Sequence, residues 1–250
     1  MSWTHSTMAI YLNYAATETS DPVERIKCII AQTTSQKYYD FILEKPLNPV
    51  LGETVQVTGQ DGAKIFLEQT SHHPPRSHML IEGPDGNYTV NGFCTLNVKA
   101  GFEKAPFANI LIDGHTTYKF KDGQTVKCSL TNFRLWNIMT GNLSWQTVGE
   151  WTLEDKANDL TAVVKMNTEK DKPQDFFSGE ICKGGQKVCS IYGNYMGFVD
   201  FDGVRYWDLR DEEHQPKHFR PIWIDKDRLR SDSTLRMDRM YLCMPDYDAG

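Results

Sequence analysis

Glu68-Gln69-Thr70-Ser71-His72-His73-Pro74-Pro75 is the stretch of sequence that says most about the fold. Each proline favours extended backbone at the residue before it, which stiffens this run at the end of a predicted strand. Histidine donates one hydrogen bond when neutral and two when charged, and a nearby anion favours the charged form. Neighbours in a regular strand point to opposite faces. His72 and His73 can therefore grip one phosphate only if the pair leaves strand geometry, which the two prolines favour.

Two further blocks accompany this run. Lys45-Pro46-Leu47-Asn48-Pro49-Val50-Leu51-Gly52-Glu53-Thr54 precedes it, and a weaker block runs from Leu229-Arg230-Ser231-Asp232-Ser233 to Asp238. In this order and at this separation, the blocks resemble those of the oxysterol-binding protein-related family. The family has Val in place of Thr70 and often a base in place of Glu44. The resemblance implies a β-barrel around a hydrophobic tunnel that holds one lipid, with a phosphoinositide headgroup at its mouth.

The resemblance also implies the residues of the headgroup site. Lys45, Asn48, His72 and His73 match the family's headgroup ligands, and Pro46 and Leu47 would shape the rim of the tunnel. A compact ammonium and an amide donor suit phosphate oxygens. The family's Lys…Glu…Arg set on a later helix would extend past the last residue of this sequence, so those partners cannot be assigned. No metal and no cofactor is expected.

Each of these residues also has a purely structural interpretation. Taken singly, Lys45 is typical of a surface lysine, and Asn48 before Pro49 is typical of a turn. Two adjacent histidines are equally compatible with buried rings that bind backbone carbonyls. A metal site at His72, His73 and His78 would lack a thiolate or carboxylate at ligand spacing.

Local patterns predict a mainly β protein. Asp21 as N-cap, Pro22 at the first helical position and Glu24 in the capping-box place predict a helix over 21–38. Strands are expected at 63–69, 88–98, 108–112, 125–130 and 145–153. The turn signals are Asp61-Gly62, Asp85-Gly86, Asp113-Gly114, Asp122-Gly123, Gly141-Asn142, Gly184-Gly185 and Asp202-Gly203. Such a long antiparallel meander curls towards closure, which removes its exposed edges.

We therefore expect a single lipid-binding domain over residues 1–250. It would consist of a short lid-like segment at 1–20, the helix at 21–38, a large, strongly curved and incomplete antiparallel β-barrel over 45–207, and a helical or irregular C-terminal flank over 208–250.

Composition narrows the possible partners and the location. The formal net charge of −6 argues against a nucleic-acid partner and against permanent adhesion to an anionic membrane. Residues 217–239 are locally basic, which fits either a solvated surface or a transient contact with anionic headgroups. Six cysteines lie far apart and are expected to be reduced. With no apolar run long enough to span a bilayer, a cytoplasmic, peripherally membrane-associated monomer is expected.

Three function classes remain open. The leading hypothesis is a lipid transfer protein that carries phosphatidylinositol 4-phosphate and a second lipid, either sterol or phosphatidylserine, between cytosol-facing membranes. The alternative is a binding module that senses a lipid without transporting it. A lipid-acting enzyme is the least favoured, because the sequence has no Gly-x-Ser-x-Gly, Cys-x-x-Cys, phosphate-binding Gly-rich or His-Glu-x-x-His motif. The sequence does not select the second lipid.

Overall fold

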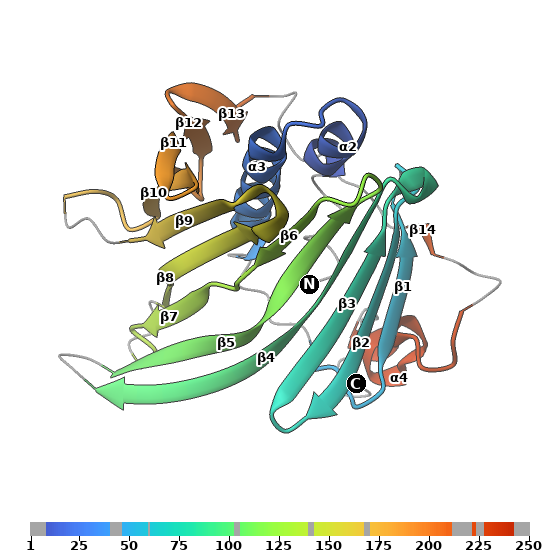
Figure 1. Ribbon diagram of the computed structural model, residues 1–250. Helices are drawn as coiled ribbons and strands as arrows, with labels where there is room; N and C mark the ends of the chain where they lie inside the picture. Colours follow the sequence, from blue (N-terminus) through green and yellow to red (C-terminus); the bar gives the residue numbers. More distant parts are fainter. Residues whose placement is uncertain are drawn as a thin grey trace.

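A single antiparallel sheet dominates the computed structural model, which describes residues 9–40, 47–59, 61–102, 106–139, 143–167, 171–211, 222–223 and 228–242. The sheet has 14 strands in the order β13-β12-β11-β10-β9-β8-β6-β5-β4-β3-β2-β1-β14, and β7 pairs with β5 and β8. It bends around helix α3 (Figure 1). The predicted fold class, a strongly curved and incomplete antiparallel barrel, is confirmed.

The helices are α2 (Ala9–Thr17), α3 (Pro22–Asp40) and α4 (Met237–Leu242), with short 3-10 turns at Pro84–Gly86, Lys156–Asn158 and Ser233–Leu235. The strands are β1 (Thr54–Thr58), β2 (Lys64–His72), β3 (Pro75–Glu82), β4 (Tyr88–Phe102), β5 (Pro106–Phe120), β6 (Thr125–Cys128), β7 (Asn132–Trp136), β8 (Ser144–Asp155), β9 (Leu160–Met166), β10 (Phe176–Lys183), β11 (Gln186–Asn194), β12 (Phe198–Phe201), β13 (Val204–Asp208) and β14 (Ile222–Trp223).

Helix α3 begins where the sequence predicts it. The Asp21 carboxylate accepts a hydrogen bond from the Val23 N–H at 3.0 Å, as an N-cap does. The capping-box assignment of Glu24 was wrong, because its carboxylate accepts from the Tyr206 hydroxyl at 2.8 Å and from Lys27 at 3.3 Å. Glu24 thus ties the helix to β13.

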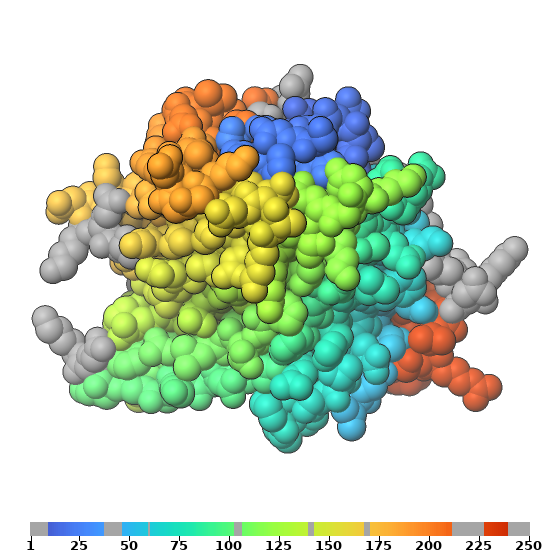
Figure 2. Space-filling model, viewed as in Figure 1, coloured from blue at the N-terminus to red at the C-terminus, as the bar shows by residue number. Residues whose placement is uncertain are grey.

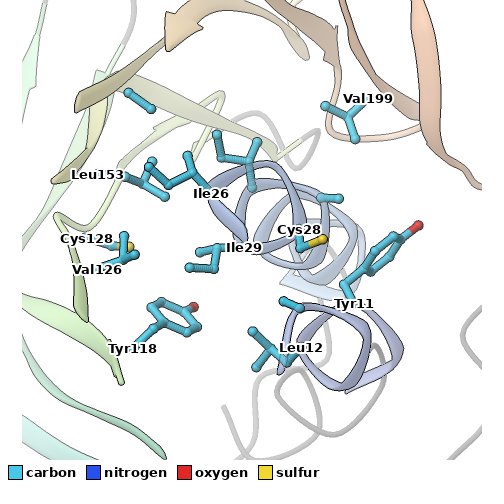
Figure 3. Close-up of a cluster of buried hydrophobic side chains, with 14 of the residues drawn as sticks. Tyr11, Leu12, Ile26, Cys28, Ile29, Tyr118, Val126, Cys128, Leu153 and Val199 are labelled. Carbon is cyan, nitrogen blue, oxygen red and sulfur yellow. The ribbon is translucent and has the colours of Figure 1, made fainter. Parts of the chain in front are cut away.

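The hydrophobic core lies between the two N-terminal helices and the concave face of the sheet. Ile26 and Ile29 are completely buried against strand residues such as Val126 and Leu153 (Figure 3). Helix α2 packs beside α3 and contributes Leu12, which is 2% exposed. Tyr11, Leu12 and Ala15 of this helix therefore belong to the core, while a lid-like role for the 1–20 segment stays a prediction.

One predicted turn was wrong. Asp113-Gly114 lies inside β5, and the connection between β4 and β5 falls at 103–105 instead. Gly114 has φ +135°, and a Cβ there would approach the Phe93 carbonyl oxygen to 2.0 Å. The glycine is needed for this close approach of two strands and not for a turn. The turn predicted at Gly141-Asn142 lies outside the described residues.

The C-terminal flank contains more sheet than expected, because β14 pairs with β1 through Val57 opposite Trp223 and Thr58 opposite Ile222. The described cysteines, at positions 28, 94, 128, 182 and 189, are all free thiols, as predicted. Among the described helices, none combines the length and the apolar character needed to cross a membrane.

Candidate functional site

The three sequence blocks singled out above meet in space. The Gly52 N–H donates to the Gln69 carbonyl at 2.8 Å, and the Gln69 N–H donates to the Glu53 carbonyl at 2.9 Å. The third block joins through Ser231, whose carbonyl accepts from the Thr54 N–H at 2.9 Å. Because these bonds connect positions far apart in the sequence, they assemble one site from three separate segments.

Glu53 ties this site together. Its carboxylate, only 3% exposed, lies 2.6 Å from Arg236 Nη1 and 3.1 Å from Arg239 Nη2, and it accepts from the Val50 N–H at 2.8 Å. Arg236 also bonds to Asp238, and this hydrogen bond holds the pKa of the Asp238 carboxyl below its usual value. A buried carboxylate with these partners is fully compensated. We call Glu53, Arg236, Arg239 and Asp238 the Glu53 clasp.

The clasp also uses two of the seven bases that make residues 217–239 locally basic. Arg236 Nη1 donates to the Asn48 carbonyl at 2.8 Å, and Arg239 Nη2 donates to the Leu47 carbonyl at 3.4 Å. These two guanidinium groups hold the second block in place. They are therefore not simple surface charges free for lipid headgroups.

His72 and His73 lie together at the turn between β2 and β3. Their ring centroids are 4.5 Å apart in an edge-to-face arrangement, and both side chains are exposed. A register shift between Gln69 and Ser71 takes the end of β2 out of regular strand geometry. Gln69, itself 4% exposed, braces this shift by donating to the Ser71 carbonyl at 2.7 Å. His72 nevertheless remains the last residue of β2, paired with Pro75, and His73 begins the turn. That the pair acts jointly outside strand geometry stays a prediction.

Of the other residues predicted at the headgroup site and its rim, the structure describes Asn48 and Leu47. Asn48 is exposed, and the structure records its carbonyl, not its side-chain amide, in a hydrogen bond. Leu47 is half-buried beside it. Lys45 and Pro46 lie outside the described residues. The assignment of these residues to a headgroup site stays a prediction. Within the described part of the chain, no group of three His, Cys, Asp or Glu could hold a metal.

A cavity of about 370 Å³ opens on the concave side of the sheet. Apolar side chains from β2, β4, β5, β7 and β8 form most of its wall, among them Leu67, Leu96, Ile112, Phe133 and Trp145. Ser77 and Met79 contribute from β3. A volume of this size falls within the range of small-molecule sites.

Helix α3 supplies the polar part of the cavity wall. Ile26, Ile29, Thr33, Gln36 and Lys37 follow at spacings of three, four, three and one residues, so they share roughly one face of the helix. The isoleucines pack in the core, whereas the other three line the cavity. The face therefore changes from apolar to polar where the core gives way to the cavity.

The polar groups at this wall are strongly buried. Lys37 is 5% exposed and donates to the Thr131 hydroxyl at 2.6 Å. Within the described structure, Gln36 Nε2 and Trp145 Nε1 are buried without a hydrogen-bond partner. Unpaired buried donors are costly, so a polar atom of a ligand is expected to pair with them. The sequence analysis missed these residues, although the change along the helix face was visible in it.

The histidine turn and the cavity share β3. His72 is opposite Pro75, and Ser77 of the cavity wall follows two residues later, about 7 Å along the strand. The turn thus lies close to the cavity along the strand, while His72 and His73 themselves are not part of the cavity wall.

Comparisons with known proteins agree with this arrangement. The family model described as "Oxysterol-binding protein" matches residues 5–241. Oxysterol-binding protein 9 of Dictyostelium discoideum is 28% identical over 237 residues, covering 82% of this chain and 53% of that protein. Oxysterol-binding protein-related protein 1 of Mus musculus is 27% identical over 217 residues, covering 81% of this chain and 22% of that protein. The chain thus spans about half or less of the length of these relatives.

Solved structures share the fold at lower identity. The Osh3 ORD in complex with PI(4)P from Saccharomyces cerevisiae superposes with a TM-score of 0.79 at 19% identity, over 98% of this chain and 70% of that chain. The Osh1 ORD domain in complex with ergosterol gives a TM-score of 0.77 at 19% identity, over 98% of this chain and 67% of that chain.

Proposed function

The chain belongs to the oxysterol-binding protein family, and on that premise we propose that it transfers lipids between cytosol-facing membranes. Phosphatidylinositol 4-phosphate would be one cargo, with sterol or phosphatidylserine as the second. The family is one of binding proteins, so the expectation that the chain is not an enzyme is confirmed.

The observation that carries this proposal is the cavity and its position beside the histidine turn. A lipid with about 30 chain methylenes costs on the order of 24 kcal/mol to expose to water, at about 0.8 kcal/mol per methylene. Enclosure of the apolar part therefore supplies most of the binding free energy. Headgroup contacts outside the cavity select among lipids instead.

Three solved structures of two related domains support the choice of cargo. The Osh1 ORD domain has been solved with ergosterol and with cholesterol, and the Osh3 ORD with PI(4)P. Each has the fold of this chain. The polar wall formed by Gln36, Lys37 and Thr131 would orient the second lipid by its polar atoms.

Replacing both His72 and His73 by Ala tests the headgroup assignment. The double variant should lose extraction of phosphatidylinositol 4-phosphate from liposomes, because the phosphate loses two donors. His115→Ala is the matched control, since the His115 ring meets Phe93 edge-to-face, with ring centroids 5.1 Å apart, and lies on β5 and not at the turn. Circular dichroism checks that both variants keep the fold. Extraction that survives in the double variant would remove His72 and His73 from the site.

A donor–acceptor liposome assay separates transport from sensing. Transfer of labelled phosphatidylinositol 4-phosphate to acceptor vesicles is expected of the wild-type protein. Stable binding with no transfer would instead support a sensor.

A further inference from the structure

The β4–β5 hairpin extends well beyond the histidine turn. The last pair between β3 and β4 is Arg76 opposite Thr95, yet β4 continues to Phe102. These seven additional residues span about 20 Å. Over this stretch, β4 pairs with β5 alone within the described chain, from Leu96 opposite Ile112 to Phe102 opposite Pro106. The hairpin therefore extends past the ends of the neighbouring strands, on the side of the sheet where the β2–β3 histidine turn lies. It is at the lower left in Figure 1.

An apolar stripe leads from the cavity out along this hairpin. Alternate residues of a strand share a face, so Val98, Ala100 and Phe102 continue the face of Leu96, which lines the cavity. Ile110, opposite Val98, lines the cavity as well. At the outer end of the stripe, Val98 is 67% and Phe102 75% exposed. The apolar surface is thus continuous from the enclosed cavity to the solvent.

The neighbouring hairpin adds to the same end of the molecule. Strand β7 pairs with β5 through Trp136 opposite Phe107, which brings the β7–β8 connection beside the end of β4–β5. This connection exposes Ile138, Met139 and Leu143, and Met139 is 83% exposed. We call Val98, Phe102, Ile138, Met139 and Leu143 the apolar tip. Strands β4 and β5 form the green lower left edge of the molecule in Figure 2.

The charge around the apolar tip has the sign that an anionic bilayer attracts. Among the described residues of the segments 96–102, 106–112, 132–139 and 143–144, the charged side chains are Lys99 and Arg134, both basic. Lys99 is exposed, whereas the Arg134 guanidinium lies over the Phe107 and Trp136 rings. Large apolar side chains at a projecting end, flanked by bases, suit insertion into the interfacial layer of a membrane. In water these apolar side chains stay exposed, which costs free energy that insertion into a bilayer would recover.

We infer that the apolar tip inserts into the surface of a lipid bilayer and places the cavity against it. Lipid would then move along the concave face of β4 and β5 without crossing water. This inference rests on the proposed function, because it gives the membrane-facing surface of a lipid carrier.

The test is a double variant, Phe102→Asp with Met139→Asp. Flotation with phosphatidylcholine–phosphatidylserine vesicles that contain no cargo lipid reads the docking alone. Flotation should fall by roughly tenfold or more, because two inserted apolar side chains become charged. Val204→Asp is the matched control, since Val204 is 60% exposed on the terminal strand β13 and should float like the wild-type protein.

A second readout distinguishes this inference from the proposed function. Fluorescent sterol and short-chain phosphatidylinositol 4-phosphate are delivered from solution, the sterol as a cyclodextrin complex. The double variant should bind them like the wild-type protein, because the cavity is intact. A wild-type protein that floats with vesicles but binds neither probe would contradict the proposed function and leave the docking surface supported.

Two results would overturn the inference. The first is unchanged flotation of the double variant, or of Met139→Asp alone should the double variant fail to fold. The second is a wild-type dimer that the substitutions dissociate in analytical ultracentrifugation, which would make the apolar tip a contact between copies of this chain.

Discussion

Glu53 connects the candidate site to the C-terminal part of the chain, because its buried carboxylate forms ion pairs with Arg236 and Arg239. The Glu53 side chain is only 3% exposed, and its replacement by Ala removes the carboxylate that pairs with Arg236. The same change leaves the Val50 N–H without its acceptor. Removing one member of a buried pair costs about 3–5 kcal/mol. We therefore expect Glu53→Ala to lower the free energy of unfolding by about 3 kcal/mol, measured by urea denaturation.

Two matched variants make this prediction specific. Glu53→Gln keeps an acceptor for Val50 but no charge, and should lose less stability than the alanine variant. Glu150→Ala breaks an exposed pair with Lys165 at 3.8 Å and should cost less than about 1 kcal/mol. If all three variants unfold at the same urea concentration, the clasp does not stabilise the fold.

The sequence allowed part of the site to be predicted at the level of single residues. The position of the histidine pair at the end of a strand follows from adjacent residues, because proline acts on its immediate neighbour. The ion pair between Glu53 and Arg236 could not be predicted in this way, since these residues are 183 positions apart in the sequence. Only the closing of the sheet through β1 and the C-terminal segment brings them together.

The β4–β5 hairpin shows how local signals can mislead about an element. The strands were predicted to be shorter than they are, at 88–98 and 108–112, and Asp113-Gly114 was predicted to be a turn because it has the composition of one. In the structure each strand is 15 residues long and pairs without a register shift. Gly114 serves the contact with Phe93, which no local pattern reveals.

Substitution of Gly114 tests that contact. An alanine Cβ would lie 2.0 Å from the Phe93 carbonyl oxygen and would also sit at φ +135°. Steric clash and backbone strain together should cost at least about 3 kcal/mol. Gly123 is the matched control, because its φ is +97° but a Cβ there meets nothing within 4 Å.

Gly123→Ala should therefore cost only about 1–2 kcal/mol, the strain of the left-handed conformation. Thermal and urea unfolding of both variants measure the difference. Equal losses for Gly114→Ala and Gly123→Ala would show that backbone strain alone explains the glycine in β5.

At the scale of the whole molecule, the cavity is where helix α3 no longer fills the curved sheet. The sequence predicts both the helix and the curling sheet, since each rests on periodicity and turn residues. It does not predict where the helix face leaves the core, because that depends on which strands lie opposite each turn. Thr33, Gln36 and Lys37 follow the buried isoleucines on roughly the same helix face, yet they line the cavity.

Cys94 reports on the occupancy of the cavity, because it lines the wall and is only partly buried. Burial raises the pKa of its thiol, so labelling with N-ethylmaleimide needs mildly alkaline pH to supply thiolate. Sterol or phosphatidylserine, each loaded separately, should protect it. At a hundred times the dissociation constant, protection slows labelling on the order of a hundredfold.

Cys182 is the internal control for this experiment. It is also partly buried and its thiol pKa is likewise raised by burial, but it lies on β10 and does not line the cavity. Peptide mass spectrometry follows both cysteines in one sample. Cargo should slow the labelling of Cys94 and leave Cys182 unchanged. If bound cargo leaves Cys94 as reactive as before, the lipid lies elsewhere, whereas equal slowing of both cysteines indicates a general tightening of the sheet.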